Sequence, residues 1–391
     1  MLQIKDRISV NITIDGKELP FRRMNKLVSM QISAGSVLAL PMVHIQYVDS
    51  MEWVSKSRCL YDGAVIDVSV TPVDKESRVY SFRLNSFKEN RQSETITYDI
   101  DGYLNYPRYW SQSSTTQMEG SSSAVLQHIA ETCGWASKDV DVESTADTQL
   151  WIPRNRRYHE WARYVAERGY STETSCMTLA VDPEFGFRYR DVLTDGAASA
   201  RHRLAVMAKD TILVSSYKPK TSSGLMNKQL GYNMKYVEQK PLSTDPFRSH
   251  QRIDVNQSQG TLMMNGTIKK GLEAGRIRIG PIDPGNVNEN YERGLYQNKR
   301  AASLFGVTLD VLTPFVTNVG LLDRVEFTAP TTVDYLRPYS TQYHVANRCI
   351  VVREVDYFEK FTLVTTSLNE EYDTPTYSDS GSLFEDVGFA P

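Results

Sequence analysis

Residues 151–170 have the sequence WIPRNRRYHEWARYVAERGY, and residues 177–191 have the sequence MTLAVDPEFGFRYRD. In the first segment, four side chains are spaced so that they share one face of a helix: Tyr158, Trp161, Ala162 and Val165. Gly169 is a residue type that commonly ends a helix. In the second segment, polar and apolar residues alternate on either side of a turn that contains Pro183. We therefore expect a helix followed by a β-hairpin, in a region of mixed α and β structure.

The first hundred residues are expected to form β-strands, because apolar residues occupy every second position in four runs. These runs are Ile8, Val10, Ile12 and Ile14; Ile66, Val68 and Val70; Tyr80, Phe82 and Leu84; and Ile96, Tyr98 and Ile100. Asp15 and Gly16 follow the first run and form a typical hairpin signal. Several strands at this spacing favour a small barrel or sandwich.

The middle of the chain predicts further elements. A helix is expected from Ala124 to Cys133, because serines that can cap it precede it and Gly134 follows it. Strand-like runs return over residues 210–237. The polar, proline-containing residues 239–259 are predicted to form an exposed loop.

A second strand-rich block is predicted towards the end of the chain. A helix is expected over residues 286–305, with Tyr291 and Phe305 on its apolar face. Apolar alternation then returns in several segments: 307–311, 325–327, 343–354 and 358–366. The last segment, residues 368–391, has acidic side chains and no basic ones, and is expected to form a tail.

Composition limits the class of protein. A chain of 391 residues has room for about two to four domains. The net charge of −3 does not suggest a general nucleic-acid-binding surface. We expect no signal peptide and no membrane span, since no apolar stretch has the required length. The four cysteines lack metal-type spacing and are expected to be reduced, mostly buried thiols: Cys59, Cys133, Cys176 and Cys349.

The sequence has no common catalytic or nucleotide-binding fingerprint. His159-Glu160 begins like a zinc-protease helix, but Arg163 stands where the second histidine is needed. Acidic residues at 139, 141 and 143 lack the rest of a calcium loop and are interpreted as a solvated strand face. The basic residues 154, 156 and 157 are interpreted as a solvated or subunit-contacting face. We therefore expect no cofactor, no metal and no enzyme activity.

Two blocks of the sequence resemble a known family. The proline-led aromatic helix and phenylalanine-rich hairpin of residues 152–191, and the helix that leads directly into strands over residues 288–368, are similar to the baseplate hub proteins of contractile-tailed bacteriophages. The helix-to-strand connection also resembles the N-terminal part of type VI secretion spike proteins. These blocks cover about a third of the chain.

The resemblance implies a β-rich α+β fold with two tube-like β-barrels. One barrel would comprise residues 1–110, and the other residues 206–237 with 306–367. An outer α+β region would comprise residues 111–205 with 238–305. The resemblance further implies a homotrimeric, pseudo-sixfold ring in the virion tail, which joins a hexameric tail tube to a trimeric central spike. Its expected partners are the tail tube protein, a separate spike protein and the surrounding baseplate wedge proteins.

Five side chains are candidate subunit or packing contacts in such a ring: Tyr158, Trp161, Val165, Tyr291 and Phe305. The alternative hypothesis is a receptor- or carbohydrate-binding tail protein or a glycosidase. A glycosidase needs two carboxyl groups across a cleft. Asp182 and Glu184 are the best candidates, although Pro183 between them favours a simple hairpin turn.

Overall fold

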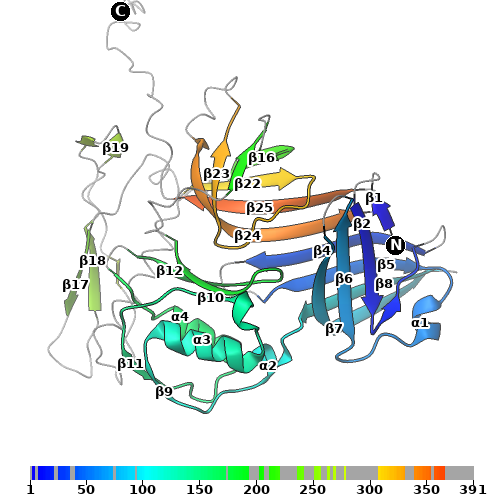
Figure 1. Ribbon diagram of the computed structural model, residues 1–391, viewed down its shortest axis with the longest axis horizontal. Helices are drawn as coiled ribbons and strands as arrows, with labels where there is room; N and C mark the ends of the chain where they lie inside the picture. Colours follow the sequence, from blue (N-terminus) through cyan, green and yellow to red (C-terminus); the bar gives the residue numbers. More distant parts are fainter. Residues whose placement is uncertain are drawn as a thin grey trace, which may run out of the picture.

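The computed structural model describes most of the chain. The described residues are 2–4, 8–21, 25–35, 40–73, 76–92, 95–172, 175–192, 202–206, 211–220, 307–330, 339–353 and 356–365, together with the backbone of five short strands between residues 236 and 278. The fold is β-rich α+β, as the sequence predicts (Figure 1). None of the helices in this part of the chain has the length and apolar character needed to cross a bilayer.

Residues 2–104 form the first β-block. Its strands are β1 (Leu2–Ile4), β2 (Ile8–Ile14), β3 (Lys17–Glu18), β4 (Asn25–Gly35), β5 (Met42–Asp49), β6 (Val65–Pro72), β7 (Arg78–Gln92) and β8 (Thr95–Leu104), with a short helix α1 (Trp53–Ser57) after β5. Their order in the sheet is β1-β2-β6-β7-β8-β5-β4. All four predicted apolar runs point into one core. Asp15 and Gly16 have φ angles of 51° and 73° and turn the chain from β2 into β3, as the hairpin signal predicts.

The second β-block comes from two separate parts of the chain. Its strands are β14 (His202–Ala205), β15 (Ile212–Leu213), β16 (Ser216–Lys220), β22 (Val307–Thr313), β23 (Arg324–Thr328), β24 (Thr341–Arg353) and β25 (Tyr357–Thr365). They follow the order β16-β22-β25-β24-β23-β14-β15. The Ser215 amide, between β15 and β16, donates to the Leu312 carbonyl on β22. The sheet therefore curls back on itself around its own apolar core.

Strand β24 joins the two β-blocks. One edge of β24 pairs with β25. The other edge pairs with β23 before a bulge between Val345 and Asn347, and with β4 of the first β-block after it. At the start of the β4 ladder the Asn347 side chain packs against Gly35, where an added Cβ would lie 2.5 Å from Asn347 Oδ1. The two β-blocks are thus parts of one continuous sheet (Figure 1).

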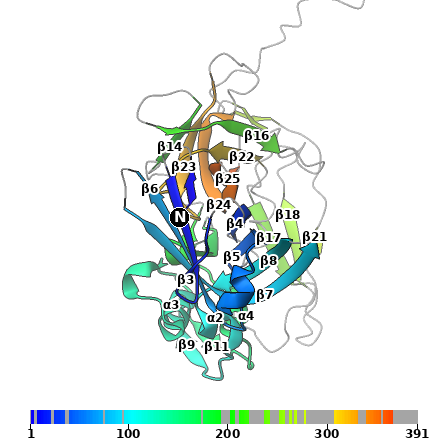
Figure 2. The same cartoon turned by 90° about the vertical axis from the view of Figure 1, so that its right-hand side faces the viewer.

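Residues 107–191 form an α+β region beside this sheet. It contains α2 (Pro107–Ser111), β9 (Met118–Gly120), α3 (Ser122–Cys133), a 3₁₀ turn (Ser137–Asp139), β10 (Val140–Val142), β11 (Gln149–Trp151), α4 (Tyr158–Ala166), β12 (Met177–Asp182) and β13 (Gly186–Asp191). Helices α3 and α4 pack on the small sheet β10-β13-β12, while β12 also contacts β4. The helices lie at the end of the molecule away from the second β-block (Figure 2).

Helix α3 ends at Cys133 as predicted and begins at Ser122, two residues before the predicted Ala124, with a serine cap as expected. The Ser121 hydroxyl oxygen accepts a hydrogen bond from the Ala124 amide, and Gly134 follows the helix with φ of 103°. Helix α4 differs at its end, because it stops at Ala166 rather than at the predicted Gly169. Gly169 is instead a site of close packing, where an added Cβ would collide with Tyr189 Oη and lie 2.6 Å from Ser122 Oγ.

Replacing Gly169 by alanine is therefore expected to reduce the free energy of unfolding by about 1–3 kcal/mol, the usual cost of overpacking. The measurement is urea denaturation followed by tryptophan fluorescence. Combining Gly169→Ala with Tyr189→Phe removes the oxygen with which the new methyl group collides, and should recover part of the loss. If the loss of unfolding free energy in the double variant equals the sum of the losses from Gly169→Ala and Tyr189→Phe alone, steric conflict with Tyr189 does not cause the destabilisation.

The prediction of an exposed loop over residues 239–259 is wrong for residues 239–241 and 251–256, and the rest of that range lies outside the described residues. The backbone forms β17 (Tyr236–Pro241) and β18 (Gln251–Asn256) in this range, and β18 also pairs with β21 (Ile277–Arg278). A further pair, β19 (Leu262–Met264) and β20 (Thr267–Lys269), follows. Ile253 and Val255 alternate with polar residues, which is the local sequence signal for this strand. The predicted helix 286–305 and tail 368–391 lie outside the described residues.

Candidate functional site

The predicted contact residues on α4 lie inside the chain's own core. Trp161 and Val165 are fully buried, and Tyr158 is half-buried against the same cluster. Their aromatic and aliphatic surfaces hold α4 against its own chain, and the two fully buried side chains offer no surface to a neighbour. The other two candidates, Tyr291 and Phe305, lie outside the described residues.

Asp182 has a structural role in the β12–β13 hairpin. One of its oxygens, Oδ1, accepts hydrogen bonds from the amides of Glu184 (2.8 Å) and Phe185 (3.1 Å), which shapes the hairpin turn. The other, Oδ2, accepts from the Leu321 amide at 2.9 Å. With both oxygens held by backbone amides and only 1% of the residue exposed, Asp182 cannot serve as the acid or base of a glycosidase. The hairpin-turn interpretation of this segment is the one the structure supports.

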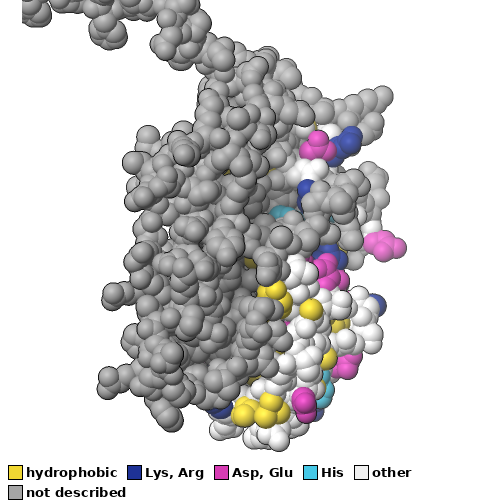
Figure 3. Space-filling model, turned by 90° about the vertical axis from the view of Figure 1, so that its left-hand side faces the viewer, with side chains coloured by type: hydrophobic (Ala, Val, Ile, Leu, Met, Phe, Trp, Pro, Cys, Tyr) yellow, Lys and Arg dark blue, Asp and Glu magenta, His cyan; other side chains and the backbone are white. Residues whose placement is uncertain are grey.

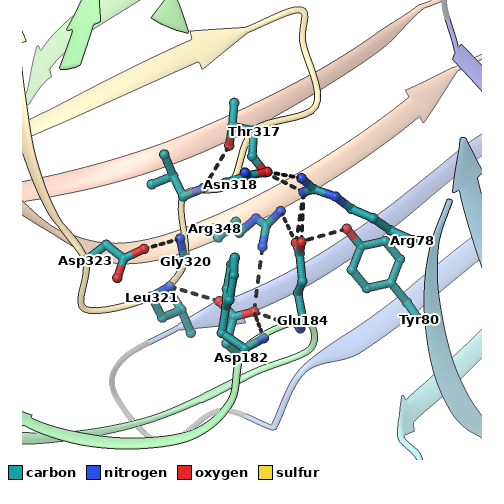
Figure 4. Close-up of polar contacts among 12 residues, drawn as sticks. Arg78, Tyr80, Asp182, Glu184, Thr317, Asn318, Gly320, Leu321, Asp323 and Arg348 are labelled. Atoms are coloured by element: carbon teal, nitrogen blue, oxygen red, sulfur yellow. Dashed lines mark hydrogen bonds and ion pairs between the residues drawn. The ribbon is translucent and has the colours of Figure 1, made fainter. Parts of the chain in front are cut away.

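Glu184 links the two β-blocks through its carboxylate (Figure 4). From the first β-block, Arg78 on β7 donates to Glu184 Oε2 at 3.0 Å, and the Tyr80 hydroxyl lies 3.4 Å from the same oxygen. From the second β-block, Arg348 on β24 donates to that oxygen at 2.9 Å. Arg78 also donates to the Thr317 carbonyl and to Asn318 Oδ1 in the connection between β22 and β23. The hairpin and both β-blocks thus meet at this carboxylate.

Arg348 is the most deeply buried cation of this group, with a side chain that is 1% exposed. Its guanidinium also lies 3.6 Å from a carboxylate oxygen of Asp182 and 3.6 Å from one of Glu359. Burial alone would lower the pKa of Arg348, but Glu359, Asp182 and Glu184 reverse this effect and hold the pKa well above its ordinary value. For Glu184, burial raises the pKa, while Arg348 and Arg78 oppose this rise.

Glu359 on β25 is also fully buried, and its hydrogen bonds are satisfied. Its Oε1 accepts from the Tyr357 hydroxyl at 2.7 Å and from the Thr317 amide at 3.2 Å. Its Oε2 accepts from the Thr317 hydroxyl at 2.7 Å. A buried carboxylate is tolerated only when it is paired and hydrogen-bonded in this way, so Glu359 ties the connection after β22 to the sheet.

A second buried ion pair lies beside the first. Arg188 on β13 donates to Asp323 Oδ1 at 2.7 Å and to the Leu321 carbonyl, and Asp323 Oδ2 accepts from the Gly320 amide at 2.7 Å. A Cβ added at Gly320 would collide with the Phe185 ring and lie 2.8 Å from Arg188 Nη1. The connection between β22 and β23 therefore fits tightly over the hairpin tip.

We call this group the ionic joint. It comprises Arg78, Asp182, Glu184, Arg188, Asp323, Arg348 and Glu359. It brings together side chains from β7, β12, β13, β24, β25, the turn between β12 and β13, and the segment between β22 and β23. Figure 4 labels five of them: Arg78, Asp182, Glu184, Asp323 and Arg348. Its carboxylates are occupied by guanidinium groups and backbone amides. The ionic joint can therefore fix the two β-blocks and the β12–β13 hairpin relative to one another. Its chemistry is that of a structural connection rather than a catalytic centre.

The other chemical candidates from the sequence are placed as follows. His159 Nδ1 lies 3.3 Å from the Tyr109 carbonyl oxygen. Asp141 is not simply solvated, because it forms ion pairs with Arg188 and Arg190. Arg156 lies over the Tyr164 ring, at 4.2 Å from its centre. Among the described residues, no three metal-binding side chains are grouped so that they could hold an ion.

The four cysteines are free thiols, and three of them are buried. Burial raises the pKa of Cys133 to about 12 and that of Cys349 to about 11. With these pKa values, fewer than about one in a hundred of the Cys133 and Cys349 thiols is ionised at pH 8. The thiolate is the reactive form, so both side chains are expected to react slowly. We expect native protein to react with a thiol reagent at pH 8 far more slowly than denatured protein, with the Cys349 rate rising as the pH approaches 11. Rapid reaction of the native protein at pH 7 would contradict this expectation.

Exposed apolar side chains occur elsewhere on the α+β region. Leu150 on β11 is 51% exposed and Ile152 is 45% exposed. Figure 3 shows hydrophobic side chains on one face of the described part of the molecule. Such side chains are available for contact with another protein, unlike the buried Trp161.

Comparison with known proteins shows that solved structures of tail proteins share this fold. No protein-family model and no curated protein matches the chain. A tail protein from Neisseria meningitidis matches with a TM-score of 0.54 and 11% identity, over 92% of this chain and 96% of that one. The 43 kDa tail protein of prophage MuSo2 from Shewanella oneidensis matches with a TM-score of 0.57 and 10% identity, over 92% and 98%.

A third solved structure links the fold to secretion systems. This E. coli protein is a component of the type VI secretion system, and has structural similarity to the T4 bacteriophage tail proteins gp27 and gp5. It matches with a TM-score of 0.50 and 8% identity, over 90% of this chain and 76% of that one. The chain therefore has the fold of these tail proteins, and the resemblance predicted from its sequence is confirmed at the level of fold.

Proposed function

We propose that this chain is the structural hub of a phage-type tail baseplate. In this proposal, three copies form a ring that joins a hexameric tail tube to a trimeric central spike, within the virion tail. Its partners are the tube protein, a separate spike protein and the surrounding wedge proteins. Its role is geometric, and no catalytic step is part of it.

One observation carries the proposal: the ladder between β4 and β24 holds two β-blocks side by side in one chain. Three chains would then present six β-blocks, which is the number needed to match a sixfold tube while keeping threefold symmetry for a spike. The shared fold with phage tail proteins supports the same role. We assign the two tube-like domains to residues 1–110 and to 206–237 with 306–367, and the outer region to 111–205 with 238–305.

The exposed side chains of the outer region suggest where neighbouring subunits meet. Leu150 and Ile152 project from β11 and its end, so we assign them to the subunit contact in place of the buried Trp161 and Val165. Replacing Leu150 by aspartate should weaken the trimer and leave the fold of the chain unchanged. Leu213→Asp, at a side chain that is 40% exposed on the second β-block, is the matched control.

The test of the function is the mass of the full chain in solution, measured by light scattering over a range of concentrations, followed by electron microscopy. We expect three times the 44.4 kDa of one chain and a ring with six similar lobes. A monomer that stays monomeric after a partner spike protein is added would overturn the proposal.

A further inference from the structure

Strand β12 lies between the two apolar cores. Leu179 and Val181 belong to the core shared by the first β-block and the α+β region, whereas Ala180 between them belongs to the core of the second β-block. A strand presents successive side chains to opposite faces, so β12 is in contact with both cores along its length. Its hairpin tip, residues 182–185, continues along the same line into the ionic joint (Figure 4).

The hairpin tip packs closely against residues of both β-blocks. The Phe185 ring centre lies 5.8 Å from the guanidinium carbon of both Arg188 and Arg348. Gly320 of the second β-block covers this ring so closely that a methyl group would not fit. On the opposite side, Arg78 reaches the tip from the first β-block. The tip is therefore held from both sides by ion pairs and by packing.

Strand β24 has a place at which it can bend. The bulge between Val345 and Asn347 adds one residue to β24 where its partner changes from β23 to β4. Bulges bend a strand and increase its twist. Arg348, which holds Glu184, is next to the bulge along the chain. The bulge and the residue that contacts the hairpin tip therefore lie within the same short length of β24.

We propose that the hairpin tip is a wedge that sets the angle between the two β-blocks, and that Glu184 keeps the wedge in place by pairing with Arg78 and Arg348. While the hairpin tip is in place, it holds β24 at a single fixed bend angle at the bulge. When Glu184 no longer pairs, the tip loses its ion pair with Arg78 of the first β-block while Asp182 still holds it to the second, and the β-blocks move relative to each other about that bulge. This inference rests on the proposed hub function in one respect: in a closed pseudo-sixfold ring, the angle between the two β-blocks of one chain must equal the angle between adjacent β-blocks of neighbouring subunits.

The experiment measures the distance between the β-blocks in the full chain. Spin labels are attached through Lys56→Cys on α1 and Arg203→Cys on β14, both at exposed side chains. Labelled protein is mixed with an excess of unlabelled protein, so that only distances within one chain are observed. We expect a single narrow distance distribution for the parent protein, and a broader or shifted distribution after Glu184→Ala.

The control is Glu167→Ala, which removes a carboxylate that pairs with Arg163 on the surface of α4. It should leave the distribution unchanged. If Glu184→Ala does not fold, Glu184→Gln retains the size of the side chain and is expected to broaden the distribution to a smaller degree. A folded Glu184 variant with the parent distribution would overturn the wedge, whatever the oligomeric state. A parent protein that fails to form trimers would instead count against the hub, since the distance measurement does not require a ring.

Discussion

Replacing Arg348 by leucine is expected to lower the free energy of unfolding by about 3–5 kcal/mol, because it leaves buried carboxylates without their cation. Glu184 would lose the guanidinium at 2.9 Å, and Glu359 and Asp182 would lose the positive charge 3.6 Å away. The loss should be visible as a lower midpoint in urea denaturation with an unchanged slope, provided that unfolding remains a single transition.

Arg203→Leu is the matched control for this experiment. Arg203 on β14 pairs with Glu326 on the neighbouring strand β23 at 3.2 Å, but the Arg203 side chain is 72% exposed. An exposed pair contributes no more than about 1 kcal/mol, so the control should change stability little. If Arg348→Leu and Arg203→Leu lower the free energy of unfolding by the same small amount, the ionic joint is not a significant source of stability. A further variant, Arg348→Leu combined with Glu184→Leu, should recover part of the loss, since it removes a carboxylate together with its cation.

Replacing Trp161 by alanine is expected to cost about 3–5 kcal/mol, the usual range for removing a buried large aromatic side chain. Trp161 has no exposed surface and packs in the core shared with the first β-block. We expect the cavity to destabilise helix α4 and the small sheet that it covers. Hydrogen exchange should therefore increase most at amides of α3, α4 and β12, while β22 and β25 stay protected.

Leu150→Ala is the control for the Trp161 variant. Leu150 belongs to the same region but is half exposed, so the change should stay within about 0.5 kcal/mol in the monomer. If Trp161→Ala and Leu150→Ala lowered the free energy of unfolding equally, Trp161 would not be a core residue of the α+β region. Equal increases in exchange in both β-blocks would mean that the chain unfolds as a single unit.

The strands were predictable because their signal is local. Ile8 to Ile14 and Val307 to Val311 alternate strictly, and each run points one face into a core. The start of α3 was predictable for the same reason, since Ser121 lies next to the amides that it caps. The end of α4 was not, because the need for Gly169 comes from Tyr189, which is distant in the sequence.

The ionic joint was not predicted, because its partners are far apart in the chain. Arg78 meets Glu184, 106 residues away, and Arg348 meets Glu184, 164 residues away. One sequence signal was available: Glu359 stands between Tyr357 and Phe361 at positions that all point inward. A charge at an inward strand position requires a buried partner, although the sequence alone does not name that partner.

The ladder between β4 and β24 also affects the order in which the protein can be made and folded. Its residues are more than 300 positions apart, so during synthesis the edge of β4 emerges from the ribosome long before β24 exists. Until then, the nascent first β-block exposes an unpaired strand edge, which is a template for pairing with other chains. We expect chains truncated before residue 341 to aggregate, and refolding of the full chain to be slow, as is usual for folds dominated by distant contacts.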